Sequence, residues 1–214
     1  MTGPAPVLLI GCGALAREIA WAIDANGWRH MELTCLPADL HNRPQAIPGA
    51  MRAKIQAARK TGKYAEIIAI YGDCGTGGLL DKVLAEEGVE RIAGAHCYEF
   101  YAGTAQFEML AEEELGSLYL TDYLVRFFDR LIIKGLGLDR FPHLRDDYFG
   151  HYRRVVYLSQ KDDPDLLARA RAAAARLDLD FVHRPTGIGG IETFLRRRAV
   201  PAHEEGRVDV LQEA

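Results

Sequence analysis

The sequence predicts an α/β protein built on a doubly wound, mainly parallel sheet, and two observations carry that prediction. Short apolar runs alternate along the chain with segments whose apolar residues recur at helical spacing. Glycine or proline closes most of these segments, as is usual where strands and helices meet. Strands that alternate with helices are joined by right-handed crossovers and lie parallel between two helical layers. We therefore expect a Rossmann-like, three-layer arrangement around a single sheet.

Four strands are expected in the first half of the chain. They are the apolar runs at residues 7–10, 31–36, 67–71 and 91–95. The first is followed by Gly11-Cys12-Gly13 and then by a helix with Leu15, Ile19 and Ile23 on one face, which ends at Gly27. Further helices are expected around residues 51–61 and 79–87, each followed by a glycine.

The second half is less regular but keeps the alternation. Strands are expected at 118–120, 155–158 and 181–183, and helices at 105–114, 121–135, 164–177 and 190–198. Thr121 is a candidate N-cap, and Asp163-Pro164 is a typical helix start. We expect residues 1–198 to form one α/β domain and residues 199–214 to form a flexible C-terminal tail.

Composition excludes several classes of protein. The formal net charge is −4 and the pI is about 6.0, which does not favour nucleic acid or an anionic membrane as a partner. The N-terminus has no basic segment before a long apolar stretch, and no run is long enough to span a bilayer. These features predict a cytoplasmic protein, in which cysteines stay reduced.

The four cysteines fall at the ends of the predicted strands. Cys12 follows the first strand, Cys35 lies at the end of the second, Cys74 follows the third and Cys97 follows the fourth. Two histidines also follow the ends of predicted strands: His41 lies in the loop after the second strand, and His96 lies beside Cys97. Because parallel strands deliver their carboxyl ends to one edge of a sheet, where ligands bind, these side chains are expected along a shared edge.

Three interpretations of this edge remain open. Cysteine is a small hydrophobe that is often simply buried. Thiolates and imidazoles also bind soft metals. The sequence has no CxxC pair, so the ligands would come from distant segments of the chain. Three thiolates that leave one coordination position open suit zinc or an iron–sulfur cluster. Finally, Cys12 and Cys74 open helices, where the helix dipole lowers a thiol pKa and creates a reactive thiol.

Glycines flank two of these cysteines. Gly11-x-Gly13-x-x-Ala16 has the spacing of a dinucleotide-binding turn, but Cys35-Leu36-Pro37 occupies the place of the expected acidic residue. We interpret Gly11 and Gly13, together with Gly72 and Gly75, as positions where the backbone approaches a small-molecule ligand. The stretch 187–190 is interpreted as a turn, with anion binding as the alternative. Aromatic residues between Phe127 and Tyr152 indicate core or a homodimer interface.

At these motifs the sequence resembles the DUF1638 family of bacteria and methanogenic archaea, over nearly its whole length. The resemblance rests on Cys12-Gly13-Ala14, Leu40-His41-Asn42-Arg43-Pro44, Tyr71-Gly72-Asp73-Cys74-Gly75 and the later Cys97. It singles out Cys12, His41, Cys74 and Cys97 and leaves Cys35 as a bystander. Relatives carry an aspartate before the last cysteine, where this chain has His96, which becomes an alternative ligand.

The resemblance also implies a metabolic setting, because family members are often encoded beside corrinoid and methyltetrahydrofolate methyltransferases. From the shared strand-end position of the thiols we expect zinc or an iron–sulfur cluster on Cys12, Cys74 and Cys97. His41 or His96 would be a further ligand, or His41 would be the catalytic acid or base. The resemblance implies that such a site acts in one-carbon metabolism. The alternatives are an accessory protein that binds a corrinoid, a folate or a methyltransferase partner, and a thiol-redox protein without metal.

Overall fold

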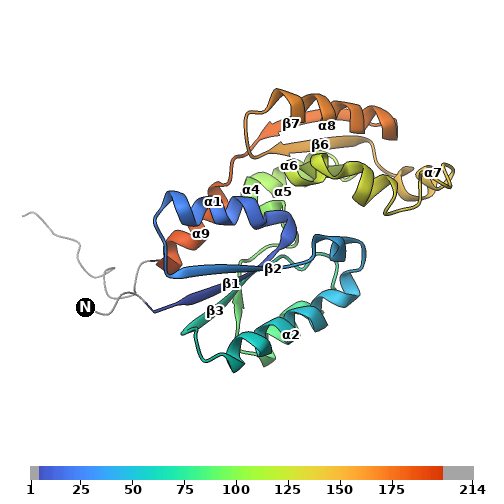
Figure 1. The fold of residues 1–214 in the computed structure, drawn as a ribbon. Coiled ribbons are helices and arrows are strands. Elements are labelled where there is room, and N and C mark those ends of the chain that lie inside the picture. The colour runs from blue at the N-terminus through green and yellow to red at the C-terminus, as the bar shows by residue number, and fades with distance from the viewer. Residues whose placement is uncertain (1–4, 200–214) are drawn as a thin grey trace, which may run out of the picture.

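A computed structural model describes residues 5–199 of the chain. Strands β1 (Val7–Cys12), β2 (Met31–Leu36), β3 (Glu66–Ile70) and β4 (Glu90–Arg91) form a parallel sheet in the order β2-β1-β3-β4 (Figure 1). The chain adds β2 on one side of β1 and then crosses to add β3 on the other. The sheet is therefore doubly wound, and its topological switch point lies between β1 and β3.

A second parallel sheet is built from the later strands. It contains β5 (Ser117–Thr121), β6 (Arg154–Ser159) and β7 (Asp180–Pro185) in that order. The predicted α/β class with parallel strands is confirmed, but the strands divide between two sheets instead of forming a single one. The break occurs after β4: only Glu90 and Arg91 pair with β3, although residues 91–95 were the expected strand, and Gly94 then turns with a φ of 142°.

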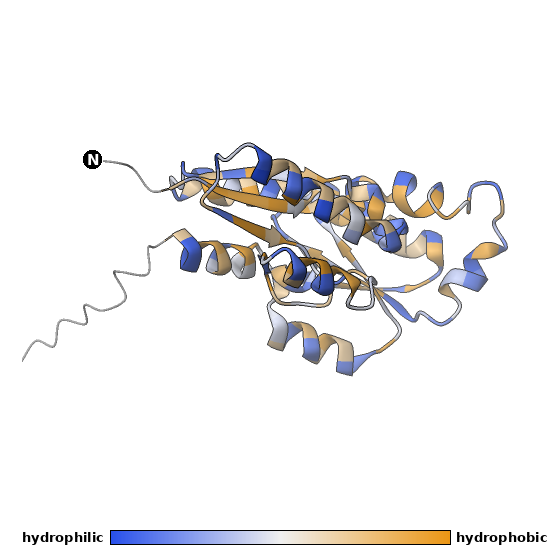
Figure 2. Ribbon diagram, turned by 90° about the horizontal axis from the view of Figure 1, so that it is seen from below, coloured by the Kyte–Doolittle hydropathy of each residue, from blue (hydrophilic) through white to orange (hydrophobic). Residues whose placement is uncertain are grey.

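Helices cover both faces of the first sheet. Helices α1 (Ala16–Ala25) and α9 (Gly189–Ala199) contact each other on one face, and α2 (Ile47–Lys60) and α3 (Leu79–Glu86) contact each other on the opposite face (Figure 1). Every residue of β1 is buried, as expected for a strand enclosed on both sides. Figure 2 shows the apolar character concentrated in the strands, with helices that alternate between apolar and polar faces.

Alternate residues of β6 pack into different hydrophobic clusters on the two faces of the second sheet. Val155 and Tyr157 of β6 pack with α6 (Asp122–Arg126) and α8 (Pro164–Leu177), whereas Val156 and Leu158 pack with Leu110 of α5 (Thr104–Glu113). Two short helices lie outside this pattern, α4 (Glu99–Ala102) before α5 and α7 (Leu144–Phe149) before β6. The expected helix over 121–135 is divided into α6 and a π-helical turn, Asp129–Ile133.

Both predicted helix starts are confirmed. The Thr121 hydroxyl accepts a hydrogen bond from the Leu124 amide at 3.4 Å, and the Asp163 carboxylate accepts from the Asp165 and Leu166 amides at 3.1 Å. None of the described helices is long and apolar enough to cross a membrane. The predicted flexible tail begins at residue 199, the end of α9, and its residues 200–214 lie outside the described part of the chain.

The last helix joins the two sheets. After β7 completes the second sheet, the chain returns to the first, where Ile191 and Leu195 of α9 are fully buried beside α1 and α4. Gly190 permits the crossing with α4, since a Cβ at this position would overlap the carbonyl oxygen of Phe100. The two sheets are thereby held with the carboxyl end of the second facing α1 of the first.

Replacement of Gly190 by alanine tests this crossing. The new Cβ meets backbone, which cannot rotate away, so we expect Gly190→Ala to lower the free energy of unfolding by about 1–3 kcal/mol, the range for overpacked sites. The measurement is urea unfolding followed by circular dichroism. Gly189→Ala is the matched control, because a Cβ there meets nothing within 4 Å. Equal stability of the two variants would contradict this account of the crossing.

Candidate functional site

A pocket of about 150 Å³ lies at the switch point of the first sheet, between the two sheets. All five predicted metal-ligand candidates line it: Cys12, His41, Cys74, His96 and Cys97. Cys12 is the last residue of β1, Cys74 follows β3, and His96 and Cys97 follow β4. The shared edge expected from parallel strands thus brings together side chains that are up to 85 residues apart, counting from Cys12 to Cys97.

Close backbone packing sets the positions of Cys74 and Cys97. The Cys74 amide donates to the Ala95 carbonyl at 2.8 Å, which ties the turn after β3 to the segment after β4. A Cβ on Gly72 would lie 2.9 to 3.1 Å from backbone atoms of His96, so only glycine allows this approach. Cys74 itself has a φ of 50°, a left-handed conformation that costs of order 1–3 kcal/mol for such residues and is concentrated at functional sites.

The glycine-rich turn beyond Cys74 is closed by a side chain. Asp73 accepts hydrogen bonds from the Thr76 hydroxyl and from the amides of Gly77 and Gly78, at 3.1 and 2.9 Å for the two amides. These bonds keep the pKa of the Asp73 carboxyl below its usual value, although partial desolvation opposes them. The amides at the start of α3 are therefore occupied by the protein itself.

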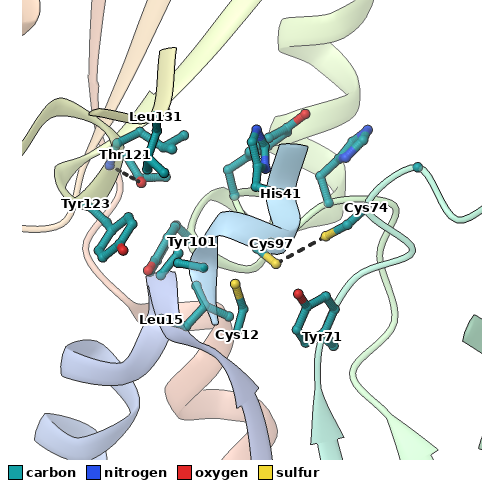
Figure 3. Close-up of a pocket in the computed structure, with 16 residues that line it drawn as sticks. Cys12, Leu15, His41, Tyr71, Cys74, Cys97, Tyr101, Thr121, Tyr123 and Leu131 are labelled. Carbon is teal, nitrogen blue, oxygen red and sulfur yellow. Dashed lines mark hydrogen bonds between the residues drawn. The ribbon is translucent and has the colours of Figure 1, made fainter. Parts of the chain in front are cut away.

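The three pocket thiols form one cluster (Figure 3). The sulfurs of Cys74 and Cys97 lie 3.3 Å apart, and Cys12 lies beside them at the end of β1. The Cys97 hydrogen bond is the main cause that lowers the pKa of Cys74 to about 5, with His96 as a further donor. It likewise lowers the pKa of Cys12, whereas the pKa of Cys97 is raised well above its usual value. Cys97 therefore keeps its proton and shares it with Cys74, the neighbour to which it is hydrogen bonded.

Little positive charge surrounds these thiols. No lysine or arginine is found among the described residues that line the pocket, and burial lowers the pKa of His41, which favours neutral imidazole. The Tyr71 hydroxyl lies beside the thiols, and burial and the nearby thiolates raise its pKa. The hydrogen bond between Cys74 and Cys97 is thus the main stabilising interaction of the Cys74 thiolate, in a pocket lined mainly by apolar and aromatic side chains.

Within residues 5–199, no three or more His, Cys, Asp and Glu side chains form a ready-made metal group. The five candidates share the pocket, but their ligand atoms do not converge on one point. The short separation of the Cys74 and Cys97 sulfurs is a contact between a thiol and a thiolate.

The remaining predicted positions are mostly structural. Of the four candidate glycines only Gly75 lines the pocket; Gly11 packs closely against Ile19, and Gly13 lies against the backbone of Leu36 and Ala38. Cys35 also lies outside the pocket. It pairs with Gly11 on β1, and burial raises its pKa to about 11, so it is an unreactive thiol.

The pocket also contains residues that the strand-end pattern did not reveal. Thr121, Tyr123 and Leu131 reach it from β5 and the segment that follows β5, and Tyr101 reaches it from α4 (Figure 3). Tyr98, which immediately precedes α4, also lines the pocket. The loop that carries His41 is fixed to this side, since the Asn42 amide group donates to the Leu131 carbonyl at 2.9 Å. The aromatic residues beside Cys74 and Cys97 in the sequence were the only signal available.

Comparison with known proteins addresses the family. A family described as "Protein of unknown function (DUF1638)" matches residues 35–195, about three quarters of the chain. The chain belongs to the DUF1638 family. The match includes His41, Cys74, His96 and Cys97 and begins after Cys12, which joins them only through the pairing of β1 with β3. No curated protein and no solved structure matches the chain.

The pKa of Cys74 provides a direct test of the cluster in this DUF1638 protein. Since the thiolate is the reactive form, alkylation of Cys74 should rise with pH and reach half its maximum near pH 5, where its pKa of about 5 places the transition. Cys97→Ala removes the main hydrogen-bond donor and should move that midpoint upward toward the ordinary value of about 9. The measurement is iodoacetamide labelling quantified peptide by peptide.

Cys35 is the internal control for this experiment. Its pKa of about 11 predicts little labelling at neutral pH in either protein. A Cys74 midpoint that stays in place in Cys97→Ala, or that matches the midpoint of Cys35, would show that Cys97 does not stabilise the Cys74 thiolate.

Proposed function

We propose that Cys12, Cys74 and Cys97 bind a single soft divalent metal ion, with zinc the best fit, and that the open coordination position faces the pocket. The observation that carries the proposal is the meeting of three thiols from three strand ends in a pocket whose lining includes no lysine or arginine. Ionised thiolates that are buried without a cation are costly, and a divalent ion bound between them would supply the missing charge.

The spacing of the sulfurs favours one ion over a cluster. Thiolates bound at about 2.3 Å around a tetrahedral zinc lie about 3.8 Å from each other. The Cys74 and Cys97 sulfurs, at 3.3 Å, need to separate by only about half an ångström to reach this spacing. In a four-iron cluster each thiolate binds a different iron, which requires a larger separation. The ion would displace the proton that Cys97 shares with its neighbours.

The pocket limits what such an ion would act on. A cavity of about 150 Å³ has the size of one that accepts benzene, so it suits a small substrate and is too small to enclose a corrinoid or a folate. Bound at the open position, a small thiol would ionise readily and become a methyl acceptor. His41, which burial keeps neutral, would be a fourth ligand or a proton acceptor. The role in one-carbon metabolism remains part of this proposal, and a methyltransferase partner would deliver the methyl group.

Metal content of the protein purified without oxygen or chelator tests the proposal. We expect about one zinc per chain, and Co²⁺ substitution should give the visible absorption bands of tetrahedral thiolate coordination. Single replacement of Cys12, Cys74 or Cys97 by serine should reduce retained metal at least about tenfold, since each removes one ligand. Cys35→Ser is the matched control and should retain the full complement, because Cys35 lies outside the pocket.

Two results would overturn this assignment. Iron with brown colour would indicate a cluster, and a metal-free protein that takes up neither Zn²⁺ nor Co²⁺ would exclude a metal site. In the second case thiol–disulfide chemistry becomes the better function, since Cys74 is a thiolate 3.3 Å from the Cys97 sulfur. Mild oxidation should then join Cys74 to Cys97, as mapped by mass spectrometry of peptides, and leave Cys35 reduced.

A further inference from the structure

A second pocket, of about 420 Å³, lies where the carboxyl end of the second sheet meets the first. Gln160 and Lys161 follow β6, and Thr186 to Gly189 follow β7 and lead into α9, while Glu18 and Trp21 come from α1. It shares no lining residue with the thiol pocket. By the same rule that places the thiols, the carboxyl end of a parallel sheet beside a helix N-terminus is a site for small molecules.

Glu18 is the unusual group in this pocket. Its residue is 6% exposed, and among residues 5–199 its carboxylate has no ion pair and no hydrogen bond to another residue; it contacts only its own backbone amide. Burial raises its pKa, the charge of nearby Asp122 raises it further, and Arg126 and Lys161 offset part of the effect from a distance. A buried carboxylate in this position lacks a cation in direct contact.

The lining of the pocket also includes hydrogen-bond donors. Within the described part of the chain, the backbone amides of Ile188 and Gly189, at the start of the eleven-residue helix α9, have no acceptor. The dipole of this helix favours negative charge at the same place. Lys161 also lines the pocket, and no carboxylate among the described residues pairs with it. Arg17 and Glu192 also line the pocket, and the Glu192 carboxylate is paired with Arg196. Among the described residues, the lining therefore combines a carboxylate that has no cation partner with amides that have no acceptor.

We propose that this pocket binds a small zwitterion of the α-amino-acid type, with its ammonium group on Glu18 and its carboxylate on the amides of Ile188 and Gly189. Such a ligand satisfies both unpaired groups at once, whereas a simple amine or a simple acid satisfies only one. A cavity of about 420 Å³ has room for an amino acid with a side chain, and the indole of Trp21, which is 54% exposed, lines the pocket and supplies an apolar contact for it.

Calorimetric titration of the full chain with each of the twenty common L-amino acids tests the site. At least one should bind saturably, and the matching carboxylic acid without the amino group, and amine without the carboxylate, should bind at least about tenfold more weakly. Glu18→Gln keeps the size of the side chain but removes its charge, and should weaken binding at least about tenfold. Asp24→Asn, on an exposed position of the same helix, is the matched control and should bind as the native chain does.

The helix end is tested by a second pair of variants. Gly189→Pro removes one amide at the first position of α9, where proline is tolerated, and should weaken binding; Gly189→Ala retains the amide and should not. The proposal is overturned if none of the amino acids binds, if the acid or the amine binds as tightly as the amino acid, or if Glu18→Gln binds like the native chain. Cys74→Ser should bind the amino acid normally, which separates this site from the thiol pocket.

Discussion

The return of the chain from the second sheet to the first is the constraint on which both pockets depend. After β7 has completed the second sheet, α9 buries Ile191 and Leu195 against the first sheet. The chain therefore connects the two sheets twice, once on leaving the first sheet and once on returning to it. The crossing of α9 and α4 at Gly190 brings backbone into contact and leaves no space for a side chain. The carboxyl ends of the second sheet are thereby held against α1 and the switch point, and the cavities form in the space between.

The thiol cluster illustrates how hydrogen bonding competes with burial. Desolvation alone would raise the pKa of every buried thiol, and it does so for Cys35, which lies outside the pocket. Cys97 opposes this effect for Cys12 and Cys74, because it keeps its own proton and stabilises the ionised form of its neighbours. The positive φ of Cys74 and the approach of Gly72 to His96 are the backbone costs of this arrangement. Backbone strain combined with unpaired charge is typical of a functional site, such as one that binds a ligand or a metal ion.

Much of this organisation could be predicted from the sequence. The alternation of apolar runs and helical periodicity identified every strand, although β4 is shorter than expected, and the glycine and aspartate signals identified most helix ends. The position of Cys12, Cys74 and Cys97 after successive strands predicted that they would share an edge, and they line one pocket. The pattern could not separate Cys35 from them, because alternate residues of a strand face opposite sides and the register of Cys35 with Gly11 is a property of strand pairing.

The sequence by itself therefore determined the parallel α/β class, the family and the group of cysteines and histidines at the strand ends, because these depend on local periodicity and on the direction of parallel strands. Tertiary structure alone decided that there are two sheets, that Tyr123 and Thr121 line the thiol pocket, and that Glu18 and the start of α9 line one further pocket. The same alternating pattern is compatible with one sheet or two. Which strands pair, and which distant helix packs on them, depends on contacts between residues far apart in the chain, which no local pattern encodes.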